Sequence, residues 1–179
     1  MNAQITSVRP GAGPHRSPLV APAEPGRVYA IPLPTTPLLT GALAHVDWSD
    51  AYAVVTPSGA PRHDPQEWAD AIFHGPPLWI RALFGLREVL VRLMGIERGG
   101  SHVFATVDWR PDEVLLGTDQ GHLGFRASVL VEPDRVVLST VVRLHNRRGR
   151  AYSALVRRIH PVVVRGMLSR AVQKVGAAS

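Results

Sequence analysis

The hydrophobic pattern in the last third of the chain changes its period once, and this change constrains the fold more than any other feature. Between His122 and Leu144, apolar residues fall at every second position in two segments separated by the turn-prone EPDR, as expected for two strands. From Arg147 to Val175 the apolar residues recur at helical spacing instead. The sequence therefore predicts a sheet followed by one long helix.

The alternation also predicts which residues of these two strands point inward. They are Leu123, Phe125, Ala127, Val129 and Val131 on the strand from His122 to Val131, and Val136, Leu138, Thr140, Val142 and Leu144 on the strand from Arg135 to Leu144. The other side of both strands is mixed in polarity, so we expect it to be solvated or half covered by a partner subunit.

Two shorter strands are predicted before these, near His102 to Asp108 and near Glu113 to Thr118. The segments between all four strands are short and turn-like, so neighbouring strands should pair antiparallel. One further strand is expected earlier in the chain, around Ser49 to Val55, and TPLLTGALAHV before it is compatible with a short helix.

One proline interrupts the final helical pattern. Pro161 lacks an N–H donor, and its ring clashes with the preceding turn. The helix is therefore expected to kink near His160 or to restart there. A kinked helix across a curved sheet can leave a space between the two.

Two helices are predicted between the early strand and the later four. In DPQEWADAIFHG, Asp64 is a good N-cap, Pro65 suits the first helical position, Glu67 completes a capping box and Gly75 is a stop signal. Residues 76–77 are both proline, which cannot continue that helix but can begin another. A sharp bend is expected between the two helices.

The second of these, PPLWIRALFGLREVLVRLMG from Pro76 to Gly95, has the length of a membrane span but not the composition. As a helix it would extend for about 28 Å. Arg87 and Glu88 near its centre cost about 5 to 7 kcal/mol on insertion scales, more than the roughly 3 to 5 kcal/mol that its apolar residues return. We predict a buried amphipathic helix and no membrane span.

Composition limits the classes of function. The chain has 179 residues and no cysteine, which excludes disulfides and thiolate chemistry and favours a cytoplasmic location. Residues 1–27 are expected to form a flexible tail rich in Pro and Gly, and residues 28–176 a single domain.

The formal net charge is +6, and ten basic residues but no carboxylate side chain follow Asp134. There is no aromatic interleaving and no helix-turn-helix or zinc module, so a solvated basic face is favoured over a nucleic-acid partner. A weak acidic partner or an anionic surface stays open as an alternative.

The predicted order of strand, two helices, four antiparallel strands and long C-terminal helix outlines an α+β fold in which a curved sheet grips the kinked last helix. With this order the chain resembles the START-like (SRPBCC) superfamily, which includes pollen-allergen-like, polyketide-cyclase-like and lipid-transfer domains. More closely, the chain resembles a bacterial family known only as a domain of unknown function. That resemblance covers roughly His45 to Val172 and is carried by HDPQEWADAIFHGPPLWIRALFGLREVLV, HLGFRASVLVE and TVVRLHNRRGRAYSALVRRIHPVVVRGML.

The superfamily resemblance implies a helix-grip fold with a hydrophobic cavity between sheet and helix, usually holding a small apolar molecule and processing one only in some branches. The closer family implies no assigned chemistry. Candidate residues for binding a small hydrophobic or aromatic ligand are Phe84, Phe125, Leu138, Thr140, Tyr152, Val156 and Val163, with His145 and His160 as polar anchors.

Two polar features allow structural roles as well as functional ones. In RLHNRRGRAY, the side chains of His145, Asn146, Arg148 and Tyr152 could converge at a cavity mouth. Asn146 can equally cap the helix and His145 satisfy a backbone group, and these structural roles are favoured. For His160 the alternatives are proton transfer and a bond to a carbonyl freed by Pro161, with the structural role again favoured.

No metal-binding pattern, phosphate loop or nucleophile elbow is present in the sequence, so no metal, cofactor or catalytic residue is assigned. Two alternatives to ligand binding remain. One is a polyketide-cyclase-like enzyme in which His160 or Tyr152 acts as general acid or base. The other is a non-catalytic interaction domain that forms a homodimer through the outer side of its sheet.

Overall fold

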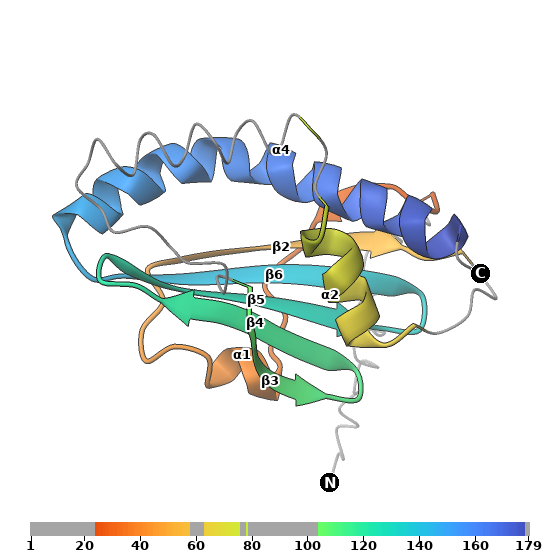
Figure 1. The fold of residues 1–179 in the computed structure, drawn as a ribbon, viewed down its shortest axis with the longest axis horizontal. Coiled ribbons are helices and arrows are strands. Elements are labelled where there is room, and N and C mark those ends of the chain that lie inside the picture. Colours follow the sequence, from red (N-terminus) through yellow and green to blue (C-terminus); the bar gives the residue numbers. More distant parts are fainter. Residues whose placement is uncertain (1–23, 58–62, 76–77, 79–103, 178–179) are drawn as a thin grey trace, which may run out of the picture.

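The computed structural model describes residues 24–57, 63–75, 78 and 104–177. Within these residues, six strands form one antiparallel sheet in the order β1-β2-β6-β5-β4-β3 (Figure 1). The strands are β1 (Val28–Ala30), β2 (Trp48–Val55), β3 (Thr106–Arg110), β4 (Glu113–Asp119), β5 (Leu123–Val131) and β6 (Arg135–Leu144). The described helices are α1 (Pro37–Thr40), α2 (Pro65–Phe73) and α4 (Arg147–Ala177).

The two long strands match their prediction closely. β6 has the predicted bounds, β5 begins one residue later than expected, and the two pair from Leu123 opposite Leu144 to Val131 opposite Val136. β3 is shifted, since it begins at Thr106 and ends at Arg110, whereas the expected strand began near His102, outside the described residues. β1 was not expected.

The start of α2 is only partly as predicted. The Asp64 carboxylate accepts a hydrogen bond from the Gln66 N–H at 2.7 Å, and Gly75 follows the helix with a φ of 67°. Glu67 does not close the predicted capping box, because its carboxylate contacts His63 Nδ1 at 3.0 Å. The predicted helix from Pro76 to Met94 lies outside the described residues, apart from Leu78.

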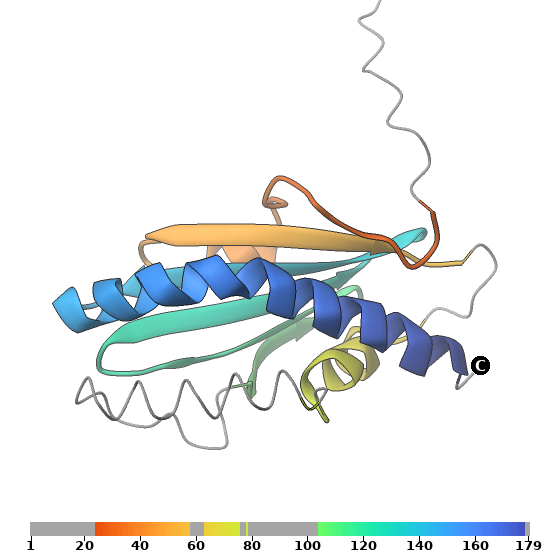
Figure 2. The same ribbon diagram turned by 90° about the horizontal axis from the view of Figure 1, so that it is seen from above.

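α4 runs without interruption from Arg147 to Ala177, and Pro161 lies inside it. The predicted restart at this proline is therefore wrong. Figures 1 and 2 show α4 arching across one face of the sheet, with β2 along one of its sides and α2 on the other. Of the helices in the described part of the chain, none combines the length and hydropathy that a bilayer span needs.

The face of the sheet toward α4 holds the main hydrophobic core. Inward side chains of the central strands pack there with the last turns of α4 and with α2. Members of this core include Val129, Val136, Leu138, Trp68, Ile72, Met167 and Leu168. The alternation in the two long strands therefore predicted the core face correctly.

The opposite face of the sheet is buried by the chain's own N-terminal segment, which corrects the expectation of a solvated or partner-covered surface. Leu38 and Leu39 of α1 pack with Leu115 and Val141. Beside them, Tyr29 and Ile31 pack against a second small cluster of apolar side chains, formed by Ala51, Ala53, Leu130 and Val137. Figure 1 shows α1 on the side of the sheet away from α4.

Candidate functional site

The seam between β2 and α4 gathers polar side chains inside an otherwise apolar layer. Because side chains alternate along a strand, Trp48, Asp50 and Tyr52 lie on the same side of β2. The register pairs them with residues of β6 whose side chains face α4, namely Val142, Thr140 and Leu138. We call Trp48, Asp50, Tyr52, Arg157, His160 and Arg165 the β2–α4 seam.

A histidine–carboxylate pair lies at the centre of the β2–α4 seam. His160 Nδ1 is 2.8 Å from Asp50 Oδ2, and the two side chains are only 16% and 22% exposed. The His160 ring also meets the Trp48 ring edge to face, with centroids 5.3 Å apart. The partner of His160 is thus a carboxylate of β2, and the expected bond to a carbonyl freed by Pro161 is wrong.

Two arginines of α4 cover the aromatic rings of β2. The Arg157 guanidinium lies 5.7 Å from the centre of the Trp48 ring, and that of Arg165 lies 5.2 Å from the centre of the Tyr52 ring. Both distances suit cation–π attraction. Burial raises the pKa of the Tyr52 hydroxyl above its ordinary value, the Asp50 charge raises this pKa further, and Arg165 opposes the rise.

Two buried polar atoms in the β2–α4 seam have no hydrogen-bond partner among the described residues. They are the indole Nε1 of Trp48, a donor, and Oδ1 of Asp50, an acceptor. Each buried polar atom left without a partner costs about 1 to 3 kcal/mol. The seam therefore holds one unused donor and one unused acceptor next to the His160 ring.

The described residues among those predicted to bind a ligand do not form a single group. Leu138 and Val163 belong to the main core, whereas Tyr152 and Val156 belong to a smaller cluster with Leu123, Val142 and Trp48. Phe125 is half-buried and packs against both clusters. Thr140 is buried and pairs with Asp50 across the two strands, and Phe84 lies outside the described residues.

His145 stands apart from the seam, at the junction of β6 and α4. The backbone N–H of His145 donates to the His122 carbonyl at 3.0 Å, and the ring Nδ1 of His145 lies 3.0 Å from the Gln120 carbonyl. Next to it, the Asn146 side chain accepts from the Gly149 N–H at 2.9 Å and donates to the Gly121 carbonyl at 3.1 Å. The favoured structural roles are confirmed, since Asn146 caps the helix and His145 meets backbone groups.

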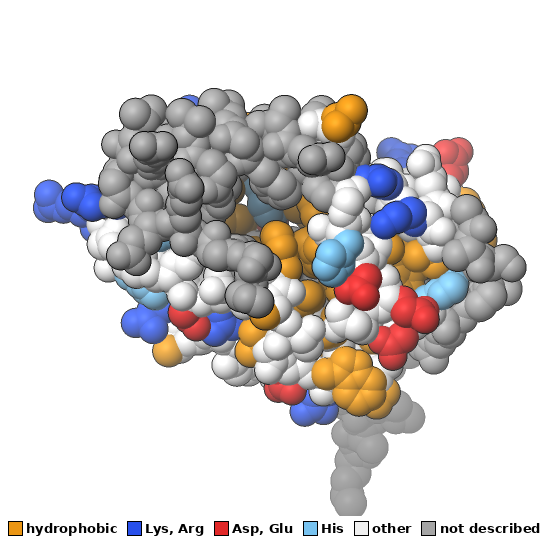
Figure 3. Space-filling view, viewed as in Figure 1, with side chains coloured by type: hydrophobic (Ala, Val, Ile, Leu, Met, Phe, Trp, Pro, Cys, Tyr) orange, Lys and Arg blue, Asp and Glu red, His pale blue; other side chains and the backbone are white. Residues whose placement is uncertain are grey.

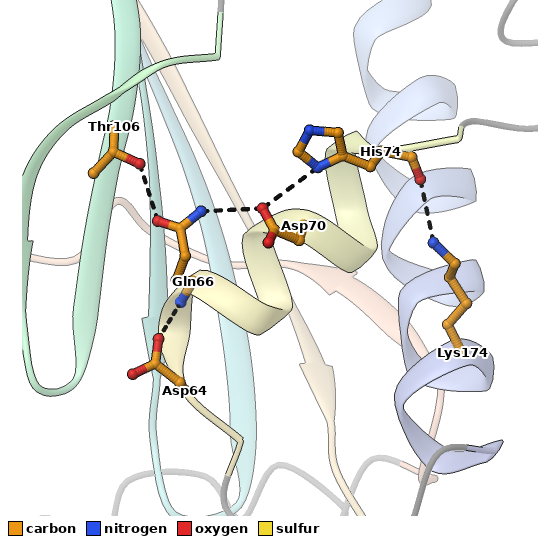
Figure 4. Close-up of polar contacts among 6 residues, drawn as sticks. All are labelled: Asp64, Gln66, Asp70, His74, Thr106 and Lys174. Carbon is orange, nitrogen blue, oxygen red and sulfur yellow. Dashed lines mark hydrogen bonds and ion pairs between the residues drawn. The ribbon is translucent and has the colours of Figure 1, made fainter.

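A second polar chain connects α2 with its neighbours (Figure 4). The Gln66 amide accepts from the Thr106 hydroxyl at 2.9 Å and donates to the Asp70 carboxylate at 3.1 Å, and Asp70 lies 3.4 Å from His74 Nδ1. Lys174 of α4 donates to the His74 carbonyl at 3.2 Å. Gln66 is half-buried and the other four residues are exposed, so these contacts hold α2 between β3 and α4 and do not form a buried site.

An aromatic row lines the core beside α2. The Phe73 and Phe104 rings are stacked with centroids 4.4 Å apart, and Phe104 meets Phe125 edge to face at 5.8 Å. All three are partly buried, and Figure 3 shows hydrophobic side chains at the surface beside α2.

Within the described residues, no group of three or more His, Asp or Glu side chains is arranged to hold a metal ion.

Sequence reasoning identified His160 but missed its partners in the seam. Trp48 and Asp50 lie 110 or more positions before His160 in the sequence, and it is the pairing of β2 with β6 under α4 that places them beside it. Arg157 is in the same helix as His160, but nothing in the sequence pattern linked it to a ring of β2. One signal was available. Asp50 occurs at an inward position of a predicted strand, where an unpaired carboxylate would be costly.

Comparison with known proteins gives one match. A family model described as a protein of unknown function (DUF2867) matches residues 42–167, which include every residue of the β2–α4 seam. No curated protein and no solved structure matches the chain.

Proposed function

The chain belongs to the DUF2867 family, and we propose that it binds a small, mainly apolar molecule between its sheet and α4. We also propose membership of the START-like superfamily. An antiparallel sheet carrying a long C-terminal helix is consistent with the helix-grip architecture of that superfamily. The β2–α4 seam supplies the polar end of the proposed site.

The observation that carries the proposal is the unused donor and acceptor in the seam. A hydroxyl group offers one acceptor and one donor, which match the unused Trp48 N–H and the unused Asp50 carboxylate oxygen. A second carboxylate or a phosphate is disfavoured there because Asp50 would repel it. The preferred ligand is therefore an apolar molecule with a hydroxyl group, such as a phenol or a long-chain alcohol.

The apolar body of such a ligand has a surface next to the seam. Trp48 packs against the cluster of Leu123, Val142 and Tyr152, and Phe125 and Val156 border the same cluster. This group joins strand side chains that face α4 with Tyr152 and Val156 of α4 itself. Binding would require α4 to move aside slightly, since the two unpaired atoms are shielded from solvent.

The test is a thermal-shift screen of hydroxylated apolar compounds against analogues that lack the hydroxyl. At a ligand concentration about 100 times Kd, the expected stabilisation is about 2.7 kcal/mol, which raises the Tm of a domain of this size by roughly 5 to 10 °C. Trp48→Phe removes the donor and should reduce the shift, whereas Trp109→Phe changes an exposed tryptophan of β3 and should not. No shift with any compound would contradict the proposal.

Native mass spectrometry of protein purified from its own host gives an independent test. A co-purified mass in the wild type that is depleted in Trp48→Phe supports the site. A co-purified mass that is equally abundant in both proteins places the ligand elsewhere.

The second candidate function is a polyketide-cyclase-like enzyme, and the pairing of His160 with Asp50 favours it. A carboxylate at Nδ1 orients the ring and leaves Nε2 as the atom that could transfer a proton to or from a bound aromatic precursor. In that case His160→Gln should abolish turnover while leaving binding of the precursor intact. Tyr152 is less suited, because it is buried and its ring meets His122 edge to face.

A further inference from the structure

The outward face of the first half of α4 exposes aliphatic side chains that a helix of a folded domain usually buries. Leu155, Ile159 and Val162 are 42%, 39% and 59% exposed. Their spacing of four and then three residues places them in one stripe on the same side of the helix. The stripe faces away from the core that α4 shares with the sheet.

Arginines flank this stripe. Arg148 and Arg158 are both exposed. Arg148 lies seven residues before Leu155 and Arg158 lies three residues after it, so both are on the same side of α4 as the stripe. Within the described part of the chain, Arg158 forms no ion pair. Figure 3 shows Lys and Arg side chains projecting at the end of the molecule where α4 begins in Figure 1.

The charge of this part of the chain has one sign. No Asp or Glu follows Asp134, so α4 offers no carboxylate to neutralise its arginines. A second copy of the chain would oppose arginine to arginine on this face, which disfavours self-association through it. The occupant that complements the face must be anionic.

We propose that the outward face of α4, formed by Arg148, Leu155, Arg158, Ile159 and Val162, binds the surface of an anionic lipid bilayer. An amphipathic helix that lies in the plane of a membrane has this combination of basic and aliphatic residues. The guanidinium groups bind headgroup phosphates, and the three aliphatic side chains enter the boundary between headgroups and acyl chains.

An acidic protein is the less favoured occupant. The three aliphatic side chains form a stripe only one residue wide with arginines beside it, which is narrower than the apolar centre that a protein interface usually has. A lipid surface needs no such shape complementarity. The proposal does not depend on a ligand in the β2–α4 seam, because His160 lies on the sheet side of α4.

The test is co-sedimentation of the full chain with two kinds of vesicle, one of phosphatidylcholine alone and one an equimolar mixture of phosphatidylcholine and phosphatidylglycerol. We expect binding to the mixed vesicles only, and weaker binding as salt is added. Arg158→Gln should weaken the binding about fivefold. The double variant Leu155→Gln/Val162→Gln should weaken it several-fold at unchanged charge.

Matched controls come from the exposed strand β3. Val107 is 51% exposed, and Arg110 is exposed as well, so Val107→Gln and Arg110→Gln make the same chemical changes away from α4. Both should bind the mixed vesicles as the wild type does. Circular dichroism and Tm establish that every variant is folded, which is expected because all the changed side chains are exposed.

Several results would overturn the proposal. They are no binding to the mixed vesicles, equal binding to both kinds of vesicle, or wild-type binding by the α4 variants. Retention of the chain on immobilised polyglutamate, without binding to mixed vesicles, would replace lipid by an acidic protein as the partner. Dimerisation lost in the α4 variants would instead identify a second copy of the chain.

Discussion

His160 Nδ1 lies 2.8 Å from Asp50 Oδ2, so two residues separated by 110 positions fasten the middle of α4 to β2. Neither side chain is more than 22% exposed, and water therefore competes only weakly for this hydrogen bond. The contact also sets the position of α4 over the sheet at the point where Pro161 interrupts its backbone hydrogen bonds. The pair is thus expected to contribute to stability whether or not it has a chemical function.

A double-mutant cycle with Asp50→Asn and His160→Gln should reveal a coupling free energy of about 1 to 2 kcal/mol in urea unfolding. The exposed pair of Asp70 and His74, with its atoms 3.4 Å apart and side chains 55% and 78% exposed, is the matched control. Its cycle with Asp70→Asn and His74→Gln should give less than about 0.5 kcal/mol. Equal coupling in the two cycles would contradict the importance of burial at the seam.

Glu113 fastens the N-terminal segment to the other face of the sheet. It is 1% exposed, and its carboxylate accepts hydrogen bonds from the Thr36 hydroxyl at 2.8 Å and from the Ser128 hydroxyl. Glu113→Ala should lower the free energy of unfolding by about 3 kcal/mol, because it leaves a cavity and two buried hydroxyls without their acceptor. Thr36→Val should cost about 1 to 2 kcal/mol, since Thr36 also caps α1.

Hydrogen exchange gives the spatial readout for this prediction. In Thr36→Val the amides of α1 should exchange faster than in the wild type, while those of β5 and β6 stay protected. Ser139→Ala is the control on the same face, because the Ser139 hydroxyl is buried and has no partner among the described residues. It should be neutral or stabilising. A loss of stability in Ser139→Ala as large as in Thr36→Val would contradict this account.

Much of the fold was predictable because local patterns determine it. Alternation defined β5 and β6 and their inward faces, and helical spacing defined α4 from its first residue, Arg147. That the segment from Tyr29 to Leu43 covers the face of the sheet away from α4 was not predictable. Prolines interrupt the segment from Tyr29 to Leu43 and leave no apolar period long enough to indicate that it packs on a sheet.

The candidate site was predictable only in part, for a different reason. His160 lies on the sheet side of a helix whose period is visible in the sequence. Its contact with Asp50 depends on the register of β2 on β6, which opposes Asp50 to Thr140. Register between strands so far apart in the chain is fixed by packing of the whole domain, so no local pattern identifies the pair.

At Gly149 the backbone of α4 lies very close to the His122 carbonyl, which could not be predicted from the sequence. A Cβ atom at this position would lie 2.2 Å from the His122 carbonyl oxygen, whereas one at Gly176 in the same helix would meet nothing within 4 Å. Alanine normally favours a helix by up to about 1 kcal/mol over glycine. Gly149→Ala should nevertheless destabilise the protein by about 2 kcal/mol or more, and Gly176→Ala should be neutral or slightly stabilising. Urea unfolding of the two variants checks this opposite sign.

The stability of the protein should fall at alkaline pH because of Tyr52. Burial raises the pKa of its hydroxyl in the folded state, the Asp50 charge adds to the rise, and Arg165 only partly offsets it. The unfolded chain therefore loses this proton at a lower pH than the folded chain does. Stability should be unaffected by this group below about pH 10 and should decline as the pH rises above that value.

The measurement is urea unfolding of the wild type and Tyr52→Phe over a series of pH values from about 8 to about 11. The phenylalanine variant has no phenol to titrate, so its stability should decline less steeply than that of the wild type above about pH 10. Tyrosinate absorbance of the folded wild type should contain a late-titrating component that Tyr52→Phe lacks. Asp50→Asn removes one cause of the raised pKa of Tyr52 and should move that titration to lower pH. Parallel curves of stability against pH for the wild type and Tyr52→Phe would show that Tyr52 does not cause the alkaline loss of stability.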